Sequence, residues 1–281
     1  MFNPENEDQI NHWNGEAGDK WVHMAELLDA MLAPHGQKVI AATPLAQGDH
    51  VLDIGCGGGA LSLMAAQKIG ANGRITGVDV SEALLDLARK RADQKGVKAD
   101  FLHEDASNFT LPEKADHALS RFGVMFFAKP AKALAIIRSN VKKDGQFSFV
   151  CWQGLKQNEW GRMPLEAALK FLKTPPEMPP PHSPGPFGFA DPDYLRDVLR
   201  EAGWQNISIE PLSSKMAMPG RDAQEAAQFM LEMGPISRLL QEQEIDMAPV
   251  EHAMATMLEN KPRQNGKVLL DSQAWLVTAI S

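Results

Sequence analysis

The chain has 281 residues, 44% hydrophobic and 23% charged, with a formal net charge of −8. The composition is typical of a globular protein, and the length suits one α/β domain with additions. The acidic balance argues against a surface for nucleic-acid phosphates, and no apolar run reaches the roughly 20 residues that span a bilayer. With only two cysteines, Cys56 and Cys151, we expect no disulfide framework and a cytoplasmic location.

Residues 1–48 predict a helical segment. Met24, Leu27, Leu28, Met31 and Leu32 recur at helical spacing up to Pro34, and a second short helix is expected over 36–42. Two aromatic residues precede them, Trp13 and Trp21. They either pack these helices onto the sheet edge or cover a ligand, and the pattern itself leaves both readings open.

Residues 50–152 alternate regularly between strand and helix patterns. Strands are predicted at 50–55, 74–79, 98–103, 116–121 and 146–152, and helices at 60–69, 82–95 and 131–141. Such βαβ alternation predicts a parallel sheet with helices on both faces, where ligands bind beyond the carboxyl ends of the strands. Gly55, Asp79, Asp105 and Arg121 all fall at those ends, so we expect one face to collect them.

The first strand of this region ends in a glycine-rich turn, Asp53-Ile-Gly55-Cys56-Gly57-Gly-Gly59, and a helix follows at once. Glycines let the backbone turn sharply and approach a ligand closely, and the N–H groups at the helix start face the same space. The spacing also fits a dinucleotide fingerprint. However, the Asp53 carboxylate would repel a pyrophosphate and suits a ligand with an ammonium group.

The part after residue 152 changes character. Eight prolines between 174 and 192 predict a loop, followed by a helix over 192–202 with Asp191 as its N-cap. Phe187, Phe189 and His182 belong to this loop. Beyond it, a strand is expected within 205–216, then helical segments, and finally two extended runs, 266–271 and 273–280.

The three motifs at the strand ends resemble those of class I S-adenosylmethionine-dependent methyltransferases, closest to the small-molecule type of ubiquinone and menaquinone biosynthesis. The motifs are the glycine turn, Gly77-Val-Asp79-Val80-Ser81, and Phe101-Leu-His-Glu-Asp105-Ala106. The likeness covers roughly residues 45–152. It implies a Rossmann-like, doubly wound sheet of seven strands, mostly parallel with an antiparallel last strand, plus an N-terminal helical lid and an α-rich insertion.

The resemblance also assigns parts and residues. It divides the chain into a lid (1–48), a cofactor-binding core (49–152), a Pro-rich insertion that forms the substrate pocket (153–190) and the C-terminal part of the core with additional helices (191–281). It places S-adenosylmethionine, and its product S-adenosylhomocysteine, with Asp79 on the ribose and Asp105 and Ala106 at the adenine. The expected cofactor set is Asp53, Gly55, Cys56, Gly57, Asp79, Val80, Asp105, Ala106, Arg121, Phe122 and Trp21. The expected acceptor set is Trp13, Phe126, Phe187 and Phe189.

No constellation of reactive side chains is evident. The eight histidines show no metal-ligand spacing, so no metal is expected. His182, His35 and His12 are weak candidates for a base, which methyl transfer needs only if the acceptor must lose a proton.

Four functions stay open: a methyltransferase acting on a small molecule, one acting on tRNA or another nucleic acid, an NAD-dependent oxidoreductase, and a catalytically silent S-adenosylmethionine-binding protein. The first is favoured, with a small-molecule acceptor as partner, no nucleic acid and no membrane span. A homodimer stays open, as does the methylated atom, whether oxygen, nitrogen, carbon or sulfur.

Overall fold

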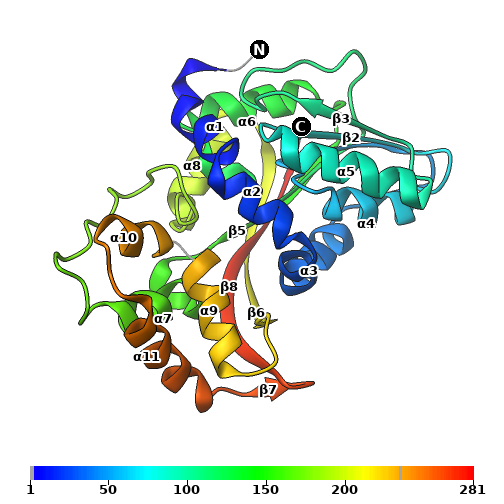
Figure 1. Cartoon of the computed structure of the whole chain (residues 1–281). Helices are drawn as coiled ribbons and strands as arrows, with labels where there is room; N and C mark the ends of the chain where they lie inside the picture. Colours follow the sequence, from blue (N-terminus) through cyan, green and yellow to red (C-terminus); the bar gives the residue numbers. More distant parts are fainter. Residues whose placement is uncertain (1–2, 234–235) are drawn as a thin grey trace.

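A twisted sheet organises the molecule (Figure 1). The computed structural model describes residues 3–233 and 236–281. Along the sheet the strands run in the order β3-β2-β1-β4-β5-β8-β6, and the short β7 pairs with β8 off this path. Their bounds are β1 His50–Ile54, β2 Arg74–Asp79, β3 Ala99–His103, β4 His117–Arg121, β5 Gln146–Trp152, β6 Gln205–Ala217, β7 Arg263–Gln264 and β8 Lys267–Ile280.

The first five strands pair in parallel, and β8 runs antiparallel to both of its neighbours, β5 and β6. This confirms the predicted fold class, and the two-residue β7 adds an eighth strand to the seven expected. The register sets Asp53 of β1 opposite Gly77 of β2, and Asp79 of β2 opposite His103 of β3. Because parallel strands end at one edge, the acidic residues of β1 and β2 reach the same end of the sheet.

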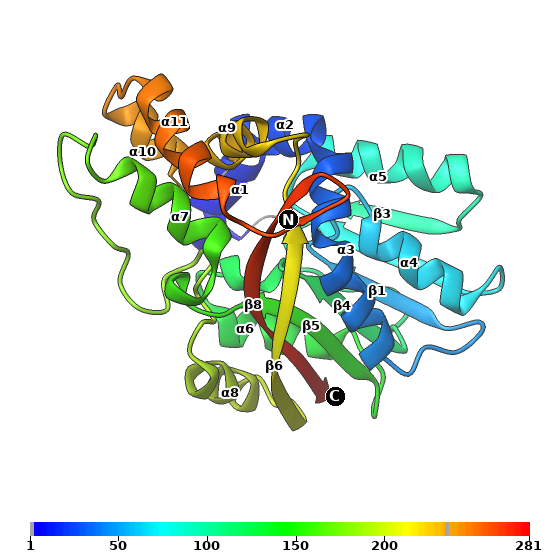
Figure 2. The same ribbon diagram turned by 90° about the horizontal axis from the view of Figure 1, so that it is seen from below.

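Helices cover both faces of the sheet. Helix α3 packs against α4, and α6 packs against α8; Figure 1 shows these two pairs on opposite sides of the sheet. A further group, α7, α9, α10 and α11, packs together beside the edge that holds β8 and β6 (Figure 2). The α-helices are α1 Glu7–Trp13, α2 Glu16–His23, α3 Ala25–Ala42, α4 Ala60–Ile69, α5 Glu82–Lys95, α6 Pro130–Ser139, α7 Glu159–Ala168, α8 Pro192–Glu201, α9 Ala223–Met233, α10 Ser237–Glu242 and α11 Met247–Glu259, and the 3₁₀ turns are η1 Pro4–Asn6, η2 Val124–Phe126 and η3 Leu155–Gln157.

Helix α3 is one continuous helix where two were expected. Pro34 lies inside it, although proline removes a hydrogen bond from a helix interior. Leu28, Leu32, His35 and Val39 are all buried along one stripe of the helix. Tertiary packing of that stripe outweighs the local cost of the proline.

Strand β8 is likewise one strand of 14 residues where two extended runs were expected. Asp271 faces outward and pairs with Lys215 of β6 at 2.7 Å. Ser272 is fully buried, and its hydroxyl donates to the carbonyl oxygen of Ser214 at 3.0 Å. Both polar residues therefore find partners without a break in the strand. Among the described residues, no helix has the length and hydropathy required to cross a bilayer.

Candidate functional site

The glycine turn after β1 has the shape that its glycines allow. Gly55, Gly57 and Gly59 adopt φ values of 62°, 51° and 79°, a region that favours glycine. A Cβ on Gly55 would lie 2.8 Å from the Cα of Gly123, in the loop after β4. Two backbones thus approach closely at the carboxyl end of the sheet, and Gly55 cannot be replaced without displacing one of them.

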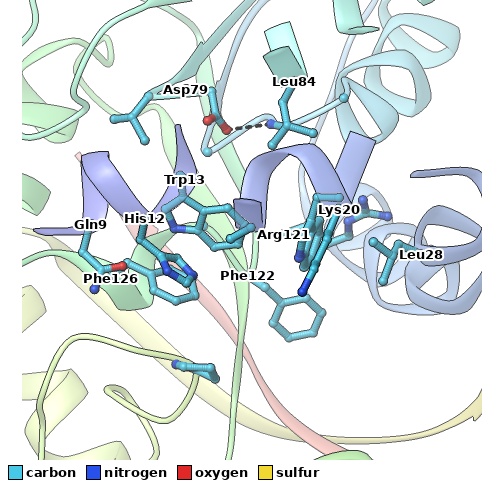
Figure 3. Close-up of a pocket in the computed structure, with 18 of the residues that line it drawn as sticks. Gln9, His12, Trp13, Lys20, Leu28, Asp79, Leu84, Arg121, Phe122 and Phe126 are labelled. Atoms are coloured by element: carbon cyan, nitrogen blue, oxygen red, sulfur yellow. Dashed lines mark hydrogen bonds between the residues drawn. The ribbon is translucent and has the colours of Figure 1, made fainter. Parts of the chain in front are cut away.

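A cavity of about 720 Å³ opens over this turn (Figure 3). It extends from the strand ends to the N-terminal helices on one side and to β6 and α9 on the other. Every residue of the predicted cofactor set lines it: Asp53, Gly55, Cys56, Gly57, Asp79, Val80, Asp105, Ala106, Arg121, Phe122 and Trp21. Trp13, Phe126 and His12 line it as well. The structure therefore brings these side chains to one cavity, and the role of each stays a prediction.

Asp53 is a buried acid of the cavity, with 1% of its surface exposed, as is Asp105. Its Oδ2 accepts a hydrogen bond from the Ser62 hydroxyl at 2.6 Å, and its Oδ1 is buried without a partner. Burial raises the pKa of this carboxyl to about 7, partly offset by the Ser62 hydrogen bond and by the positive charge of Arg121. A cation placed beside Oδ1 would favour the charged form and supply the absent partner.

Arg121 presents the opposite charge. Its Nη2 donates to Oδ1 of Asp29 at 2.7 Å, and the other oxygen of Asp29 accepts from Arg91 at 2.8 Å. Arg91 also donates to the carbonyl oxygen of Gly58, in the glycine turn. The Nη1 atom of Arg121 is buried with no partner. Asp53 and Arg121, which both line the cavity, thus each have one buried polar atom without a hydrogen-bond partner.

Asp79, at the end of β2, is held in place by backbone groups. Its Oδ2 accepts from the N–H of Gly57 at 2.8 Å and its Oδ1 from the N–H of Ser81 at 2.9 Å. Burial raises the pKa of this carboxyl, and the two backbone hydrogen bonds lower it. Each carboxylate oxygen accepts more than one hydrogen bond, so Asp79 retains capacity for hydroxyl donors in the cavity.

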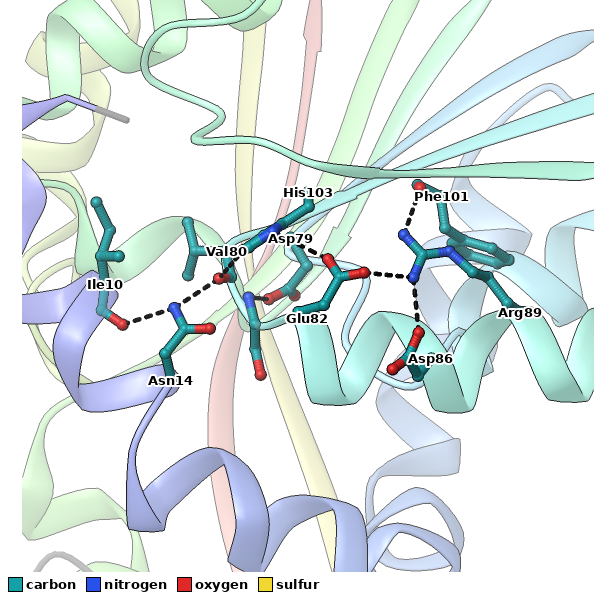
Figure 4. Close-up of polar contacts among 10 residues, drawn as sticks. Ile10, Asn14, Asp79, Val80, Glu82, Asp86, Arg89, Phe101 and His103 are labelled. Atoms are coloured by element: carbon teal, nitrogen blue, oxygen red, sulfur yellow. Dashed lines mark hydrogen bonds and ion pairs between the residues drawn. The ribbon is translucent and has the colours of Figure 1, made fainter. Parts of the chain in front are cut away.

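Residues before α2 contact the segments that follow β2 and β3, and Figure 4 shows the contact between Asn14 and Val80. Asn14 donates to the carbonyl oxygen of Val80 at 2.7 Å. Asn6 donates to both oxygens of Asp105, at 3.1 and 3.0 Å, and Ser107 donates its backbone N–H to Oδ1 at 2.8 Å. Asp105 is therefore engaged by the chain itself, and an adenine contact would have to share the carboxylate with Asn6.

Trp13 and Trp21 form part of the roof over the cavity. Their rings meet edge to face at 5.5 Å, and Trp13 meets Phe126 in the same way at 5.7 Å. Edge-to-face contacts of this kind stabilise aromatic clusters. The arrangement joins α1 and α2 to the loop after β4.

Four predicted residues do not line the cavity: His35, His182, Phe187 and Phe189. His35 is fully buried behind Phe122 and Trp152, and burial lowers its pKa to about 4. His182 stacks on Tyr194 at 3.8 Å, Phe187 packs on Trp160, and Phe189 is buried in the core. Their contact with a ligand stays a prediction.

The far wall of the cavity consists of residues that the sequence did not single out. They include Met31, Trp152, Trp160, Met216, Met218, Phe229, Met230 and Met233, which come from α3, β5, α7, the β6 end and α9. Trp152 stands at the carboxyl end of β5 and could have been found from that position. The methionines carry no such signal, because their role depends on how distant segments meet. Asp29 and Arg91 were missed for the same reason.

The described part of the chain shows neither a reactive thiol nor a cluster of metal-binding side chains. Burial raises the pKa of the Cys56 and Cys151 thiols, so both stay protonated and are poor nucleophiles. The described residues contain no cluster of three or more His, Cys, Asp or Glu side chains placed to hold a metal ion.

A family model matches part of the chain. Residues 51–145, from β1 to the start of β5, match a family model described as a methyltransferase domain. The chain carries a methyltransferase domain. The match agrees with the methyltransferase motifs found in the sequence, and the glycine turn, Asp79 and Asp105 lie inside the matched segment.

Two curated proteins that resemble this chain are named as methyltransferases of small molecules or of ubiquinone biosynthesis. An aklanonic acid methyltransferase from Streptomyces sp. (strain C5) is 28% identical over 52% of this chain and 62% of its own length, so less than two thirds of that relative is covered. A ubiquinone biosynthesis O-methyltransferase from Roseobacter denitrificans is 27% identical over 75% of this chain and 86% of its own.

A solved structure extends the likeness of the fold to nearly the whole chain. The geranyl diphosphate C-methyltransferase of Streptomyces coelicolor A3(2), in complex with Mg²⁺, geranyl diphosphate and S-adenosyl-L-homocysteine, superposes with a TM-score of 0.55. It is 15% identical, and the match covers 99% of this chain and 98% of that one. At this identity the comparison shows the fold alone.

Proposed function

We propose that this methyltransferase transfers the methyl group of S-adenosylmethionine to a small-molecule acceptor. Methyltransferases of small molecules among its relatives support the proposal, and the chemistry of the cavity supports it independently. S-Adenosylmethionine combines an amino-acid end, a ribose and an adenine, and the cavity offers groups suited to the first two.

The observation that carries the proposal is that two charged side chains each have a buried atom without a hydrogen-bond partner. Asp53 has a buried oxygen and Arg121 a buried guanidinium nitrogen, each without a partner, and both residues line one cavity. An α-amino acid carries an ammonium and a carboxylate on one carbon. Its ammonium would donate a hydrogen bond to Oδ1 of Asp53, and its carboxylate would accept one from Nη1 of Arg121. Both would be charge-assisted hydrogen bonds in a buried site. An NAD pyrophosphate offers no ammonium and would face the Asp53 carboxylate.

The remaining contacts follow the strand ends. Asp79 would accept the ribose hydroxyls, because two backbone N–H groups fix its carboxylate and leave lone pairs over. Asp105 and Ala106 would meet the adenine, with Asn6 sharing the carboxylate. Trp21, from α2, would cover the cofactor from the lid side.

Methyl transfer depends on the positions of cofactor and acceptor more than on reactive side chains of the protein. The bound sulfonium supplies an already activated methyl group. The chain would bind the cofactor through Asp53 and Arg121, hold the acceptor against the aromatic roof at near-attack distance, and exclude water. His12 lines the cavity, and burial together with the charge of Arg238 lowers its pKa, so it is neutral and able to accept a proton at pH 7. It is our candidate where the acceptor must be deprotonated.

We also propose a cellular location and leave the oligomeric state to experiment. A cytoplasmic location is supported by the two free, buried cysteines, which suit a reducing compartment. A homodimer is compatible with the chain, and size-exclusion chromatography with light scattering decides it.

Calorimetry tests the proposed function. S-Adenosylmethionine and S-adenosylhomocysteine are expected to bind, and NAD, NADP and tRNA are not. Asp53→Asn should weaken S-adenosylhomocysteine binding by about 1.5–3 kcal/mol, the scale of a hydrogen bond to a charged group. Asp100→Asn is the matched control, since Asp100 pairs with Arg74 on the surface. Equal binding of NAD would contradict the proposal, and lack of turnover with a broad panel of acceptors would favour a silent cofactor-binding protein.

A further inference from the structure

Asp29, on α3, lines the cavity and bridges two guanidinium groups that come from other elements. Its Oδ1 accepts from Nη2 of Arg121, at the end of β4, at 2.7 Å, and its Oδ2 accepts from Nη1 of Arg91, on α5, at 2.8 Å. The same Nη1 of Arg91 donates to the carbonyl oxygen of Gly58 at 2.8 Å. Hydrogen bonds thus connect the glycine turn to Arg91, Arg91 to Asp29, and Asp29 to Arg121.

Helix α3 also confines the stem of Arg121. A Cβ on Gly36 would lie 3.5 Å from Cδ of Arg121 and 3.3 Å from Sδ of Met64, so the helix passes in close contact with that stem. Gly36 follows Asp29 by about two helical turns, and both therefore face the same side of α3. The helix holds Arg121 at two points, at its stem by packing and at its head by an ion pair.

The charges of this group do not balance, because one carboxylate serves two guanidiniums. Without the Asp29 carboxylate, Arg91 and Arg121 would lie close together with no anion between them and would repel each other. The three side chains are only 11–25% exposed, so water screens their charges less than it does on the open surface. We therefore expect the orientation of Arg121 to depend on Asp29.

Asp29 and the cofactor use different atoms of Arg121. Asp29 accepts from Nη2, whereas the proposed cofactor contact uses Nη1, which has no partner among the described residues. A guanidinium is a planar, rigid fork of donors, so a partner that fixes one nitrogen also fixes the direction of the other. Asp29 can thus orient Arg121 without taking the place of the ligand carboxylate.

We propose that Asp29 is a positioning residue for cofactor binding. It holds the guanidinium of Arg121 in the orientation that receives the α-carboxylate of the cofactor, and Arg91, bonded to the glycine turn, anchors Asp29 in its place. The inference rests on the proposed function, because it takes Arg121 as the group that binds the carboxylate. It adds α3 to the elements that determine cofactor affinity.

Two ligands separate the carboxylate contact from the rest of the cofactor. S-Adenosyl-3-thiopropylamine is S-adenosylhomocysteine without its carboxylate, and it retains the ammonium, the ribose and the adenine. By calorimetry on the full chain, Asp29→Asn should weaken S-adenosylhomocysteine binding about tenfold, the effect of losing a hydrogen bond to a charged group. The same variant should bind S-adenosyl-3-thiopropylamine within about twofold of the wild type. Asp86→Asn is the matched control, since Asp86 pairs with Arg89 on the surface of α5, and it should change neither affinity.

A double variant shows whether Asp29 acts through Arg121. Arg121→Met removes the guanidinium and should itself weaken S-adenosylhomocysteine binding by about tenfold or more. Asp29→Asn added to Arg121→Met should then change the affinity by less than about twofold, because the group that Asp29 positions is gone. Losses that add up in the double variant would show that Asp29 acts by another route and would overturn the inference.

The outcomes separate the two claims. If the wild type does not bind S-adenosylhomocysteine, the proposed function fails and takes this inference with it. If the wild type binds both ligands equally well, Arg121 is not the carboxylate contact and the inference alone is overturned. Equal weakening of both ligands in Asp29→Asn, including a loss of folding, would indicate a structural role or a contact with the ammonium. Tighter binding of S-adenosylhomocysteine in Asp29→Asn would show that Asp29 competes for Arg121, and either result would overturn the positioning role.

Discussion

At the scale of single residues, the site is defined by groups whose hydrogen-bonding capacity is incomplete. Asp53 and Arg121 each keep one buried atom unpaired, although both already have a partner on their other atom. Leaving such atoms unpaired costs free energy in the ligand-free protein. A ligand that completes them recovers that cost on binding. We therefore expect these two unpaired atoms to contribute to ligand selectivity.

Asp53 also predicts a pH dependence of cofactor binding. Its pKa, raised to about 7 by burial, lies above its ordinary value of 3.8, so the ligand-free carboxyl takes up a proton as the pH falls through 7. An ammonium ligand needs the carboxylate, and binding must then release that proton. The dissociation constant of S-adenosylhomocysteine should rise about tenfold between pH 7 and pH 5.5, a range in which the ligand ammonium itself stays charged.

Calorimetry across that pH range, in buffers of different ionisation enthalpy, measures both the affinity and the released proton. Asp53→Asn has no carboxyl to titrate and should bind more weakly but nearly independently of pH. A wild-type affinity that stays flat from pH 7 to pH 5.5 would remove Asp53 from the ammonium contact.

At the scale of elements, the N-terminal helices are tied to the core by a few polar contacts near the cavity. Asn6 donates to Asp105 and Ser107, and its own side-chain oxygen accepts from the N–H of Ala128. Asn14 adds the contact with Val80. Residues of α1 and α2 also line the cavity, so we expect release of a bound cofactor to require these contacts to open. Lids of this kind often limit ligand release.

Asn6→Ala should therefore speed release of S-adenosylhomocysteine. Loss of a hydrogen bond to a charged group, at about 1.5 kcal/mol or more, corresponds to roughly a tenfold faster dissociation if it is broken before release. Stopped-flow displacement by excess S-adenosylmethionine measures the rate. Asn260→Ala, at the exposed end of α11, is the matched control and should leave it unchanged. An unaltered rate in Asn6→Ala would show that the N-terminal segment does not gate release.

The elements predicted best were those whose signal is local. From β1 to β5, each strand or helix has its own periodicity, and each strand end carries its own polar residue, so Asp53, Asp79 and Asp105 could be assigned to one edge. Asn6 could not, because nothing near it in the sequence indicates a contact with Asp105, 99 positions later. The continuity of α3 through Pro34 likewise depends on packing against the sheet.

At the scale of the whole molecule, the cavity is lined by segments that lie far apart in the sequence. The N-terminal α1 and α2 cover one side, and β6 and α9 supply the apolar wall on the other, while the sheet between them provides the charges. Sequence reasoning placed the acceptor pocket in 153–190, and from that segment only Trp160 and Pro186 line the cavity. The wall methionines come together only when β6 and α9 are packed beside β5, which no local pattern encodes.

Distant segments create the cavity, so the unfolded chain has no binding site. A ligand therefore binds only the folded chain and should raise its free energy of unfolding. A ligand at 100 times its dissociation constant stabilises the fold by about 2.7 kcal/mol. For a domain of this size class, each kcal/mol raises the melting temperature by about 2–4 °C, so S-adenosylhomocysteine should raise it by about 5–11 °C. Differential scanning fluorimetry measures the shift, with NADP at the same concentration expected to give none.

Asp53→Asn, measured at an unchanged ligand concentration, should retain only part of the shift, because the ligand then binds more weakly. A comparable shift with NADP would mean that the cavity selects for the nucleoside and not for the amino-acid end, against the pairing of Asp53 and Arg121 on which the proposed function depends.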